Sequence, residues 1–138
     1  MTAHTGGCLC GAVRYTVSEP LREILVCHCG ECRRWHGGPG AYTAAPREAL
    51  AFVGDGEAAV RWIESPASET GASRAFCTRC GSSLFWRVPG RSTISIAAGS
   101  LDQPTGLRVG GHIHTSAAAD YEPAGEDGLP RWAGGLGG

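Results

Sequence analysis

Cysteine is the residue type whose number and spacing point most directly to chemistry in this sequence of 138 residues. The cysteines fall into three short groups, namely Cys8 and Cys10; Cys27, Cys29 and Cys32; and Cys77 and Cys80. Seven cysteines cannot all pair into disulfides, and the central three cannot pair among themselves. In a reducing compartment, clustered cysteines more often bind a metal or take part in catalysis. We therefore interpret the groups first as zinc ligands.

The first predicted site combines two pairs of cysteines. Cys77 and Cys80 form C-x-x-C and are followed at once by Gly81, a pattern typical of a zinc knuckle, in which the glycine permits a tight turn. A knuckle supplies only two of the four ligands of a closed structural site. Either remaining group could complete it, but the pair Cys8 and Cys10 fits without remainder. We predict that these four cysteines hold a structural zinc that stabilises the fold directly.

The remaining group, Cys27, Cys29 and Cys32, offers three ligands and leaves one coordination position open, which is the pattern of a catalytic zinc. Three thiolates make the metal a weak Lewis acid that suits a soft fourth ligand, such as a substrate thiolate. The group therefore predicts thiol chemistry. Because its ligands lie on one short segment, we expect weaker metal binding than at the first site and partial occupancy in some preparations.

Two other interpretations of the central group stay open. Cys27 could be a buried apolar residue at the end of a strand. Cys29 and Cys32 would then form a redox pair, or would bind a metal together with Cys77 and Cys80.

Nearby histidines suggest a further alternative, a closed site of three cysteines and one histidine. His36 is the better candidate for this role, because His28 is expected to point away from its neighbours. A second pair, His112 and His114, lies in "GGHIHTS", which predicts a strand with both imidazoles on one face. We interpret this second pair as surface or core residues rather than ligands.

The composition excludes several classes of protein. The formal net charge is −1 and the pI is about 6.5, so the chain lacks the basic footprint of a duplex nucleic-acid binder. No apolar run approaches the roughly 20 residues that span a bilayer, so we expect no membrane partner. The N-terminal residues show no signal peptide, which predicts a cytoplasmic protein.

Short apolar segments bounded by turn-forming residues predict seven to nine strands in a single, mainly β, mostly antiparallel domain covering residues 1–138. The segments are "AVRYTV", "REILVC", "LAFVG", "AVRWIES", "SRAFC", "SLFWRV" and "TISIAAG". In the first of them, Val13, Tyr15 and Val17 should share one face. The segment "CGECRRWHGGPG" is interpreted as a loop with room for one helical turn. Residues 117–138 are interpreted as a surface tail with a disordered end.

Four motifs in succession resemble those of the glutathione-dependent formaldehyde-activating enzyme family, which also includes centromere protein V. They are "GGCLCGAVRY", "CHCGECRRWHG", "FCTRCGSSLFW" and "AAGSLD". The likeness extends from about Gly6 to Pro130. It implies a β-tent fold of short antiparallel sheets pinned by zinc. It also implies the division of ligands described above, with a structural four-cysteine zinc and a catalytic three-cysteine zinc.

The resemblance further implies a carbon–sulfur lyase whose partner is a small thiol such as glutathione, which condenses with formaldehyde to S-hydroxymethylglutathione. Arg33 and Trp35 follow the central cysteines directly and are predicted to border the substrate pocket. Arg33 would hold a substrate carboxylate by a bidentate contact. The alternatives are a non-catalytic, zinc-stabilised binding module and a redox or zinc-sensing protein.

Overall fold

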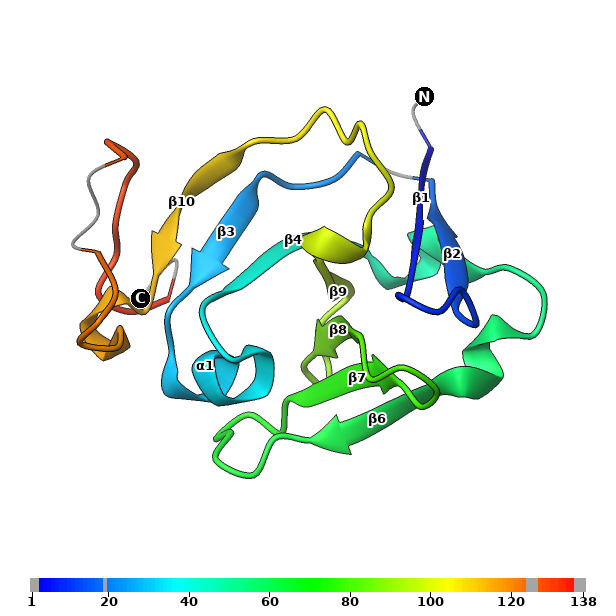
Figure 1. Ribbon diagram of the computed structural model, residues 1–138, viewed down its shortest axis with the longest axis horizontal. Coiled ribbons are helices and arrows are strands. Elements are labelled where there is room, and N and C mark those ends of the chain that lie inside the picture. The colour runs from blue at the N-terminus through cyan, green and yellow to red at the C-terminus, as the bar shows by residue number, and fades with distance from the viewer. Residues whose placement is uncertain (1–2, 19, 124–126, 136–138) are drawn as a thin grey trace. The chain divides into compact units, whose positions relative to one another are not determined.

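Short strands account for most of the regular structure, as the turn-rich sequence predicts. The computed structural model describes residues 3–18, 20–123 and 127–135 (Figure 1). The strands found in those residues are β1 (His4–Gly7), β2 (Arg14–Val17), β3 (Ile24–Cys27), β4 (Gly40–Pro46), β5 (Leu50–Phe52), β6 (Val60–Glu64), β7 (Ser73–Cys77), β8 (Ser83–Arg87), β9 (Thr93–Ala97) and β10 (Val109–Ile113). The helices found there are α1 (Gly30–His36) and the 3-10 turns η1 (Arg47–Ala49), η2 (Gly56–Ala59), η3 (Ala98–Ser100) and η4 (Thr115–Ala117). The predicted mainly β class is confirmed.

The chain divides into two compact units, each built from two stretches of sequence. Unit 1 comprises Met1–Arg22 and Thr43–Gly106, and unit 2 comprises Glu23–Tyr42 and Leu107–Gly138. Strand β4 begins in unit 2 and continues into unit 1. Each cysteine cluster lies wholly within one unit, so the geometry of each cluster is set within that unit.

In unit 1, an antiparallel sheet has the strand order β1-β2-β5. Tyr15 lies opposite Gly6 on one side and opposite Phe52 on the other. The prediction that Val13, Tyr15 and Val17 share a face is confirmed, because all three side chains are fully buried. This apolar face fixes the register of β2, since a shift by one residue would expose it to solvent.

The strands β6, β7, β8 and β9 of the same unit form an antiparallel meander. Phe85 on β8 is fully buried and is a central contact of the core. Its ring meets Tyr15 at a centroid distance of 5.4 Å and Phe52 at 5.9 Å, both edge to face. These aromatic contacts join the meander to the small sheet and so support the two loops that carry the first cysteine cluster.

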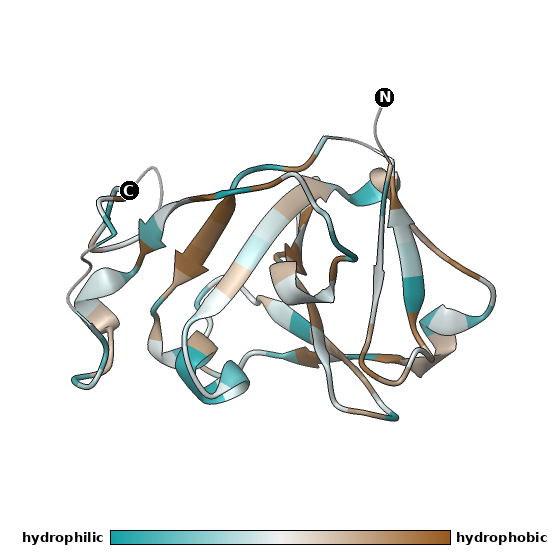
Figure 2. Ribbon diagram, turned by 45° about the horizontal axis from the view of Figure 1, so that its top comes forward, coloured by the Kyte–Doolittle hydropathy of each residue, from teal (hydrophilic) through white to brown (hydrophobic). Residues whose placement is uncertain are grey.

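In unit 2, β3 lies between β4 and β10 (Figure 1). The pairing with β4 is antiparallel and sets Cys27 opposite Gly40, whereas the pairing with β10 is parallel and sets Cys27 opposite Ile113. Figure 2 shows β3 as an almost continuous hydrophobic strand, in which buried positions alternate with half-buried ones. Cys27 thus ends a well-anchored strand.

The segment after β3 corrects one prediction, because the expected loop contains the two-turn helix α1. Cys29 caps its N-terminus with extended backbone (φ −66°, ψ 159°), and its sulfur accepts the N–H of Cys32 at 3.3 Å. Gly37 ends the helix in the left-handed conformation at φ 79°, which glycine adopts without strain. Across the described residues, no helix has both the length and the apolarity needed to traverse a membrane.

The C-terminal segment is fastened to β10. The N–H of His112 donates to the carbonyl of Pro130 at 2.9 Å, and the N–H of Trp132 donates back to the carbonyl of His112 at 2.9 Å. The predicted strand containing both His112 and His114 is wrong in part: β10 ends at Ile113, and His114 adopts a left-handed conformation (φ 53°, ψ 38°). The predicted disordered end falls on residues 136–138, which lie outside the described residues.

Candidate metal centres

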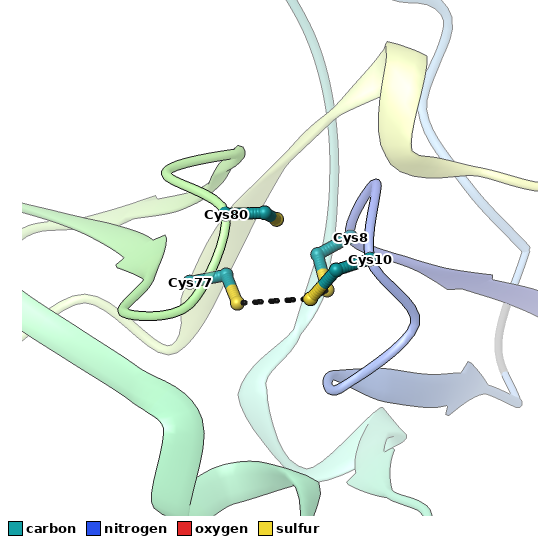
Figure 3. A group of neighbouring side chains, drawn as sticks. All are labelled: Cys8, Cys10, Cys77 and Cys80. Carbon is teal, nitrogen blue, oxygen red and sulfur yellow. Dashed lines mark hydrogen bonds between the residues drawn. The ribbon is translucent and has the colours of Figure 1, made fainter.

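The first cysteine cluster is built by two loops of unit 1 that face each other (Figure 3). Cys8 and Cys10 follow β1 in the turn toward β2, while Cys77 ends β7 and Cys80 lies in the turn before β8. Gly81, with φ 80°, provides the left-handed residue that this second turn needs. The structure therefore brings together the four cysteines that the sequence predicts.

The distances between the sulfur atoms fit a tetrahedral zinc. All four lie within 4.8 Å of one another, with 3.6 Å between Cys8 and Cys10 and 3.9 Å between Cys10 and Cys77. Zinc–sulfur bonds of about 2.3 Å in tetrahedral geometry require sulfur atoms about 3.8 Å apart. A disulfide would need about 2.05 Å, and none of the seven cysteines forms one in the structure.

Hydrogen bonds hold the two cysteine loops together. The N–H of Val13 points to the sulfur of Cys8 at 3.3 Å. Ser82 connects the loops, because its hydroxyl oxygen accepts the N–H of Leu9 at 2.9 Å and lies 3.2 Å from the sulfur of Cys80. Sequence reasoning missed Ser82, since a serine after a knuckle carries no signal that it reaches the other loop.

Cys80 and Cys10 of this cluster differ in how readily they lose their protons. Hydrogen bonds from the side chain and backbone of Ser82 lower the pKa of Cys80 to about 5. For Cys10, a backbone hydrogen bond at Ala12 favours the thiolate, but burial and the other three thiols raise the pKa to about 11. The cluster therefore resists carrying four negative charges by itself. A divalent cation would compensate that charge, so this donor set fits zinc.

The second cluster consists of Cys27, Cys29 and Cys32 in unit 2, whose sulfur atoms also lie within 4.8 Å of one another. Cys27 and Cys32 are buried, and Cys29 is half-buried. Strand β3 fixes Cys27, and the first turn of α1 fixes the other two relative to each other. Hydrogen bonding to the thiols of Cys29 and Cys32, together with burial, raises the pKa of Cys27, so this cluster too calls for a compensating cation.

Two alternatives for this cluster do not match the structure. The cluster of potential ligands contains no histidine nitrogen within the described residues, so neither His36 nor His28 completes a closed site. The ring of His36 instead meets the hydroxyl of Tyr42, with 2.8 Å between Nε2 and Oη. The alternative that pairs Cys29 and Cys32 with the knuckle also fails, because the knuckle cysteines join the first cluster.

His28 is not among the grouped potential ligands, and its ring contacts residues far away in the sequence instead. It is buried and lies in a row of four groups held by three contacts. Its Nδ1 is 2.5 Å from Oε1 of Glu122, and its Nε2 is 2.8 Å from Nδ1 of His112, whose Nε2 is 2.7 Å from Oδ2 of Asp127. The row links His28, which lies between two cluster cysteines, to the C-terminal segment.

Arg33 and Trp35 lie on α1 next to the second cluster, and both are half-buried. The Nε of Arg33 is buried without a hydrogen-bond partner among the described residues. The charge of Arg33 also acts on Glu122. Burial opposes ionisation of that carboxyl, but the N–H of Ala119, His28 and Arg33 lower its pKa. Arg33 therefore brings positive charge and an unused donor to this side of unit 2.

A comparison with known families identifies the chain. The sequence profile described as glutathione-dependent formaldehyde-activating enzyme (GFA) matches residues 3–117. The chain belongs to this family. An uncharacterized lyase of Schizosaccharomyces pombe is 31% identical to it over 88 residues, which are 62% of this chain and 58% of that protein. A candidate glutathione-dependent formaldehyde-activating enzyme of Halomonas elongata is 32% identical over 84 residues, 58% of this chain and 53% of that protein.

The alignments with both relatives span a little more than half of their lengths. Among solved structures, a crystal structure of a Rhodobacter sphaeroides protein superimposes with a TM-score of 0.58 at 19% identity, covering 93% of this chain and 98% of that one. This likeness supports the fold of the GFA-family chain. The family match ends at residue 117, so Glu122 and Asp127 lie beyond it.

Proposed function

We propose that the chain is a zinc-dependent, lyase-type enzyme that forms or breaks the carbon–sulfur bond of thiol–aldehyde adducts such as S-hydroxymethylglutathione. The observation that carries the proposal is the division of the cysteines into a complete group of four and a separate group of three. Family membership and a lyase-named relative support the reaction class. Seven cysteines that form no disulfide are consistent with a reducing compartment such as the cytosol.

In this proposal, Cys8, Cys10, Cys77 and Cys80 hold a structural zinc, and Cys27, Cys29 and Cys32 hold a catalytic one. A zinc ion bound by three cysteines would stabilise a substrate thiolate or polarise an aldehyde oxygen. In the cleavage direction, the adduct loses its C–S bond and its hydroxyl proton, and it yields the aldehyde and the protonated thiol. The reverse direction consumes both and forms the same bond.

The contribution of Arg33 is substrate binding. Glutathione carries two carboxylates, and a guanidinium binds such a group with two parallel hydrogen bonds. The side chain of Arg33 is half-buried on α1, directly after Cys32 in the sequence. Trp35, on the same helix, would border the bound thiol. Arg34 is exposed on the same helix and supplies a matched control.

The test combines zinc content, thermal unfolding and adduct turnover. Cys29→Ser should bind one zinc instead of two, lose turnover and keep its melting temperature. Cys80→Ala should lose the structural zinc and unfold, because structural binding energies of about 10–16 kcal/mol match or exceed typical folding stabilities of about 5–15 kcal/mol. Full turnover in a Cys29→Ser protein with a single zinc would overturn the proposal. A wild-type protein with two zinc ions and no turnover would favour the binding or sensing alternative.

A separate measurement addresses substrate binding. Arg33→Ala should raise KM about 10- to 100-fold for a glutathione adduct, because hydrogen bonds to charged groups contribute about 1.5–3 kcal/mol. The value of kcat should change little. Arg34→Ala should behave like the wild type. Equal effects of the two substitutions would contradict the assigned role of Arg33.

A further inference from the structure

The C-terminal segment supplies two carboxylates that contact the imidazoles of His28 and His112, and the family profile covers neither of them. Glu122 and Asp127 bracket the imidazoles of His28 and His112 in one continuous row of hydrogen bonds. His28 lies between two of the cluster's cysteines in the sequence. The row therefore includes the residue that lies between two of the predicted metal ligands.

We propose that Glu122 is a positioning residue for the three-cysteine site, acting through His28 to fix the backbone between Cys27 and Cys29. The inference rests on the proposed function only in taking these cysteines as metal ligands. Glu122 touches neither cysteine in this arrangement, and it acts by holding the residue between them.

His28 is held at three points, which accounts for its precise placement. Its backbone N–H donates to the carbonyl of Ile113 at 3.0 Å, and its two ring nitrogens contact Glu122 and His112. The residue is only 6% exposed, so water cannot replace a missing partner. Removing the carboxylate would leave a buried ring nitrogen unsatisfied and allow the imidazole to turn.

Glu122 and His112, which contact the ring of His28, are themselves held in place by hydrogen bonds to the backbone. Oε2 of Glu122 accepts the N–H of Ala119 at 2.7 Å, which fixes the carboxylate. His112 is held by backbone hydrogen bonds on both sides, to Pro130 and Trp132. The cluster's ligands, by contrast, come from one short segment. Ordering that segment in advance removes the conformational cost that metal binding would otherwise have to meet.

The experiment measures zinc release from the zinc-loaded full chain into excess chelator. Wild type should release two zinc ions in two phases, and the phase missing from Cys29→Ser identifies the three-cysteine site. Glu122→Ala should accelerate that phase about tenfold or more, as expected when a supporting hydrogen bond near a metal ligand is lost. The four-cysteine phase should not change. Glu122→Gln, which keeps an oxygen acceptor, should restore much of the slow release.

Asp120 is an exposed carboxylate in the same segment, so Asp120→Asn is the matched control and should release both ions as wild type does. Equal acceleration of both phases in Glu122→Ala would overturn the inference, because it would indicate a general loss of stability. An unchanged three-cysteine phase in both Glu122 variants would also overturn it and would leave the proposed function standing. A wild-type protein that binds one zinc would overturn both.

Discussion

Tyr15 offers a quantitative test of how unit 1 is held together beneath its cysteine loops. The residue is fully buried, and its hydroxyl lies 2.6 Å from Oγ of Ser100. The hydroxyl of Ser100 donates to the carbonyl of Ala97 at 2.7 Å, so its oxygen accepts from Tyr15. Tyr15 also pairs with Gly6 in the hairpin that carries the first two cysteines. The substitution Tyr15→Phe keeps the ring and removes only the hydroxyl.

Two opposing effects determine how Tyr15→Phe changes the free energy of unfolding. At neutral pH, the variant loses one hydrogen bond, which should lower the free energy of unfolding by about 1 kcal/mol. Burial raises the pKa of Tyr15 from 10.0 to about 12, although the hydrogen bond with Ser100 opposes this rise. A raised pKa in the folded state gives a contribution that is fully present below pH 10 and is lost as the pH rises through about 12. The rise in pKa corresponds to a free energy of about 2–3 kcal/mol.

The two stability curves should therefore cross. Urea unfolding from pH 7 to about pH 12 should show wild type more stable at neutral pH and Tyr15→Phe more stable at the alkaline end. Both proteins contain all the other ionisable groups. Their titration therefore cancels when the two free energies of unfolding are subtracted. Tyr121, which is 70% exposed, supplies the control, and Tyr121→Phe should run parallel to wild type. Parallel curves for Tyr15→Phe as well would refute the argument that burial of this hydroxyl controls its ionisation.

Three further outcomes follow from single contacts. Ser82→Ala removes the contacts to the N–H of Leu9 and to the sulfur of Cys80, and because the Leu9 contact is exposed to water, urea unfolding of the zinc-loaded protein should show a loss of only about 0.5–1.5 kcal/mol. Gly30→Ala places a methyl group where no atom lies within 4 Å, so it should raise the melting temperature, with a gain of up to about 1 kcal/mol in helix stability. Arg14 lowers the pKa of Asp102 to about 2, so this carboxylate's stabilising effect should be complete above about pH 4 and vanish toward pH 2, and Asp102→Asn should flatten that part of the acid-unfolding curve.

The sequence identifies most of the strands because their burial is local and periodic. Segments such as "SRAFC" and "TISIAAG" correspond to β7 and β9 with little or no error at their ends. Strand β1 was missed because "HTGG" contains two glycines and no large apolar residue. It exists because Gly6 fits beneath Tyr15, where an added Cβ would come within 2.4 Å of the tyrosine hydroxyl. Such a requirement depends on the partner strand and has no local signature.

The helix α1 was predicted as no more than a single turn within a loop, for a different reason. Helix starts are recognised by serine, threonine, aspartate or asparagine at the cap, and here the cap is Cys29. The helix is also short, and it begins with glycine, which disfavours helices. The same thiol that caps the helix is a predicted metal ligand. The cysteine spacing that indicates a metal site therefore gives no sign of the helix α1, which positions two of the ligands.

The partners of His28 could not be predicted from the sequence because they lie far away along the chain. Glu122 lies 94 residues away, in a segment whose alanine, glycine and charge pattern carries no strand or helix period. The two cysteine groups, by contrast, could be predicted because metal ligands leave a spacing signal even when their folding context is unknown. The spacing of the cysteines therefore identifies the candidate ligands, whereas the residues that position those ligands are seen only in the folded structure.

The two clusters differ most in the length of the loop that a bound metal would close. A metal at the first cluster would join Cys10 to Cys77, which are 67 residues apart, whereas Cys29 and Cys32 are three apart. Closing the longer loop costs about 2–3 kcal/mol more entropy in the unfolded chain, so a metal there would restrict the unfolded state far more strongly. Binding at the first cluster would therefore couple to folding. Binding at the second would leave the fold almost unchanged, which is what a site needs if its open position is to exchange substrate without unfolding the protein.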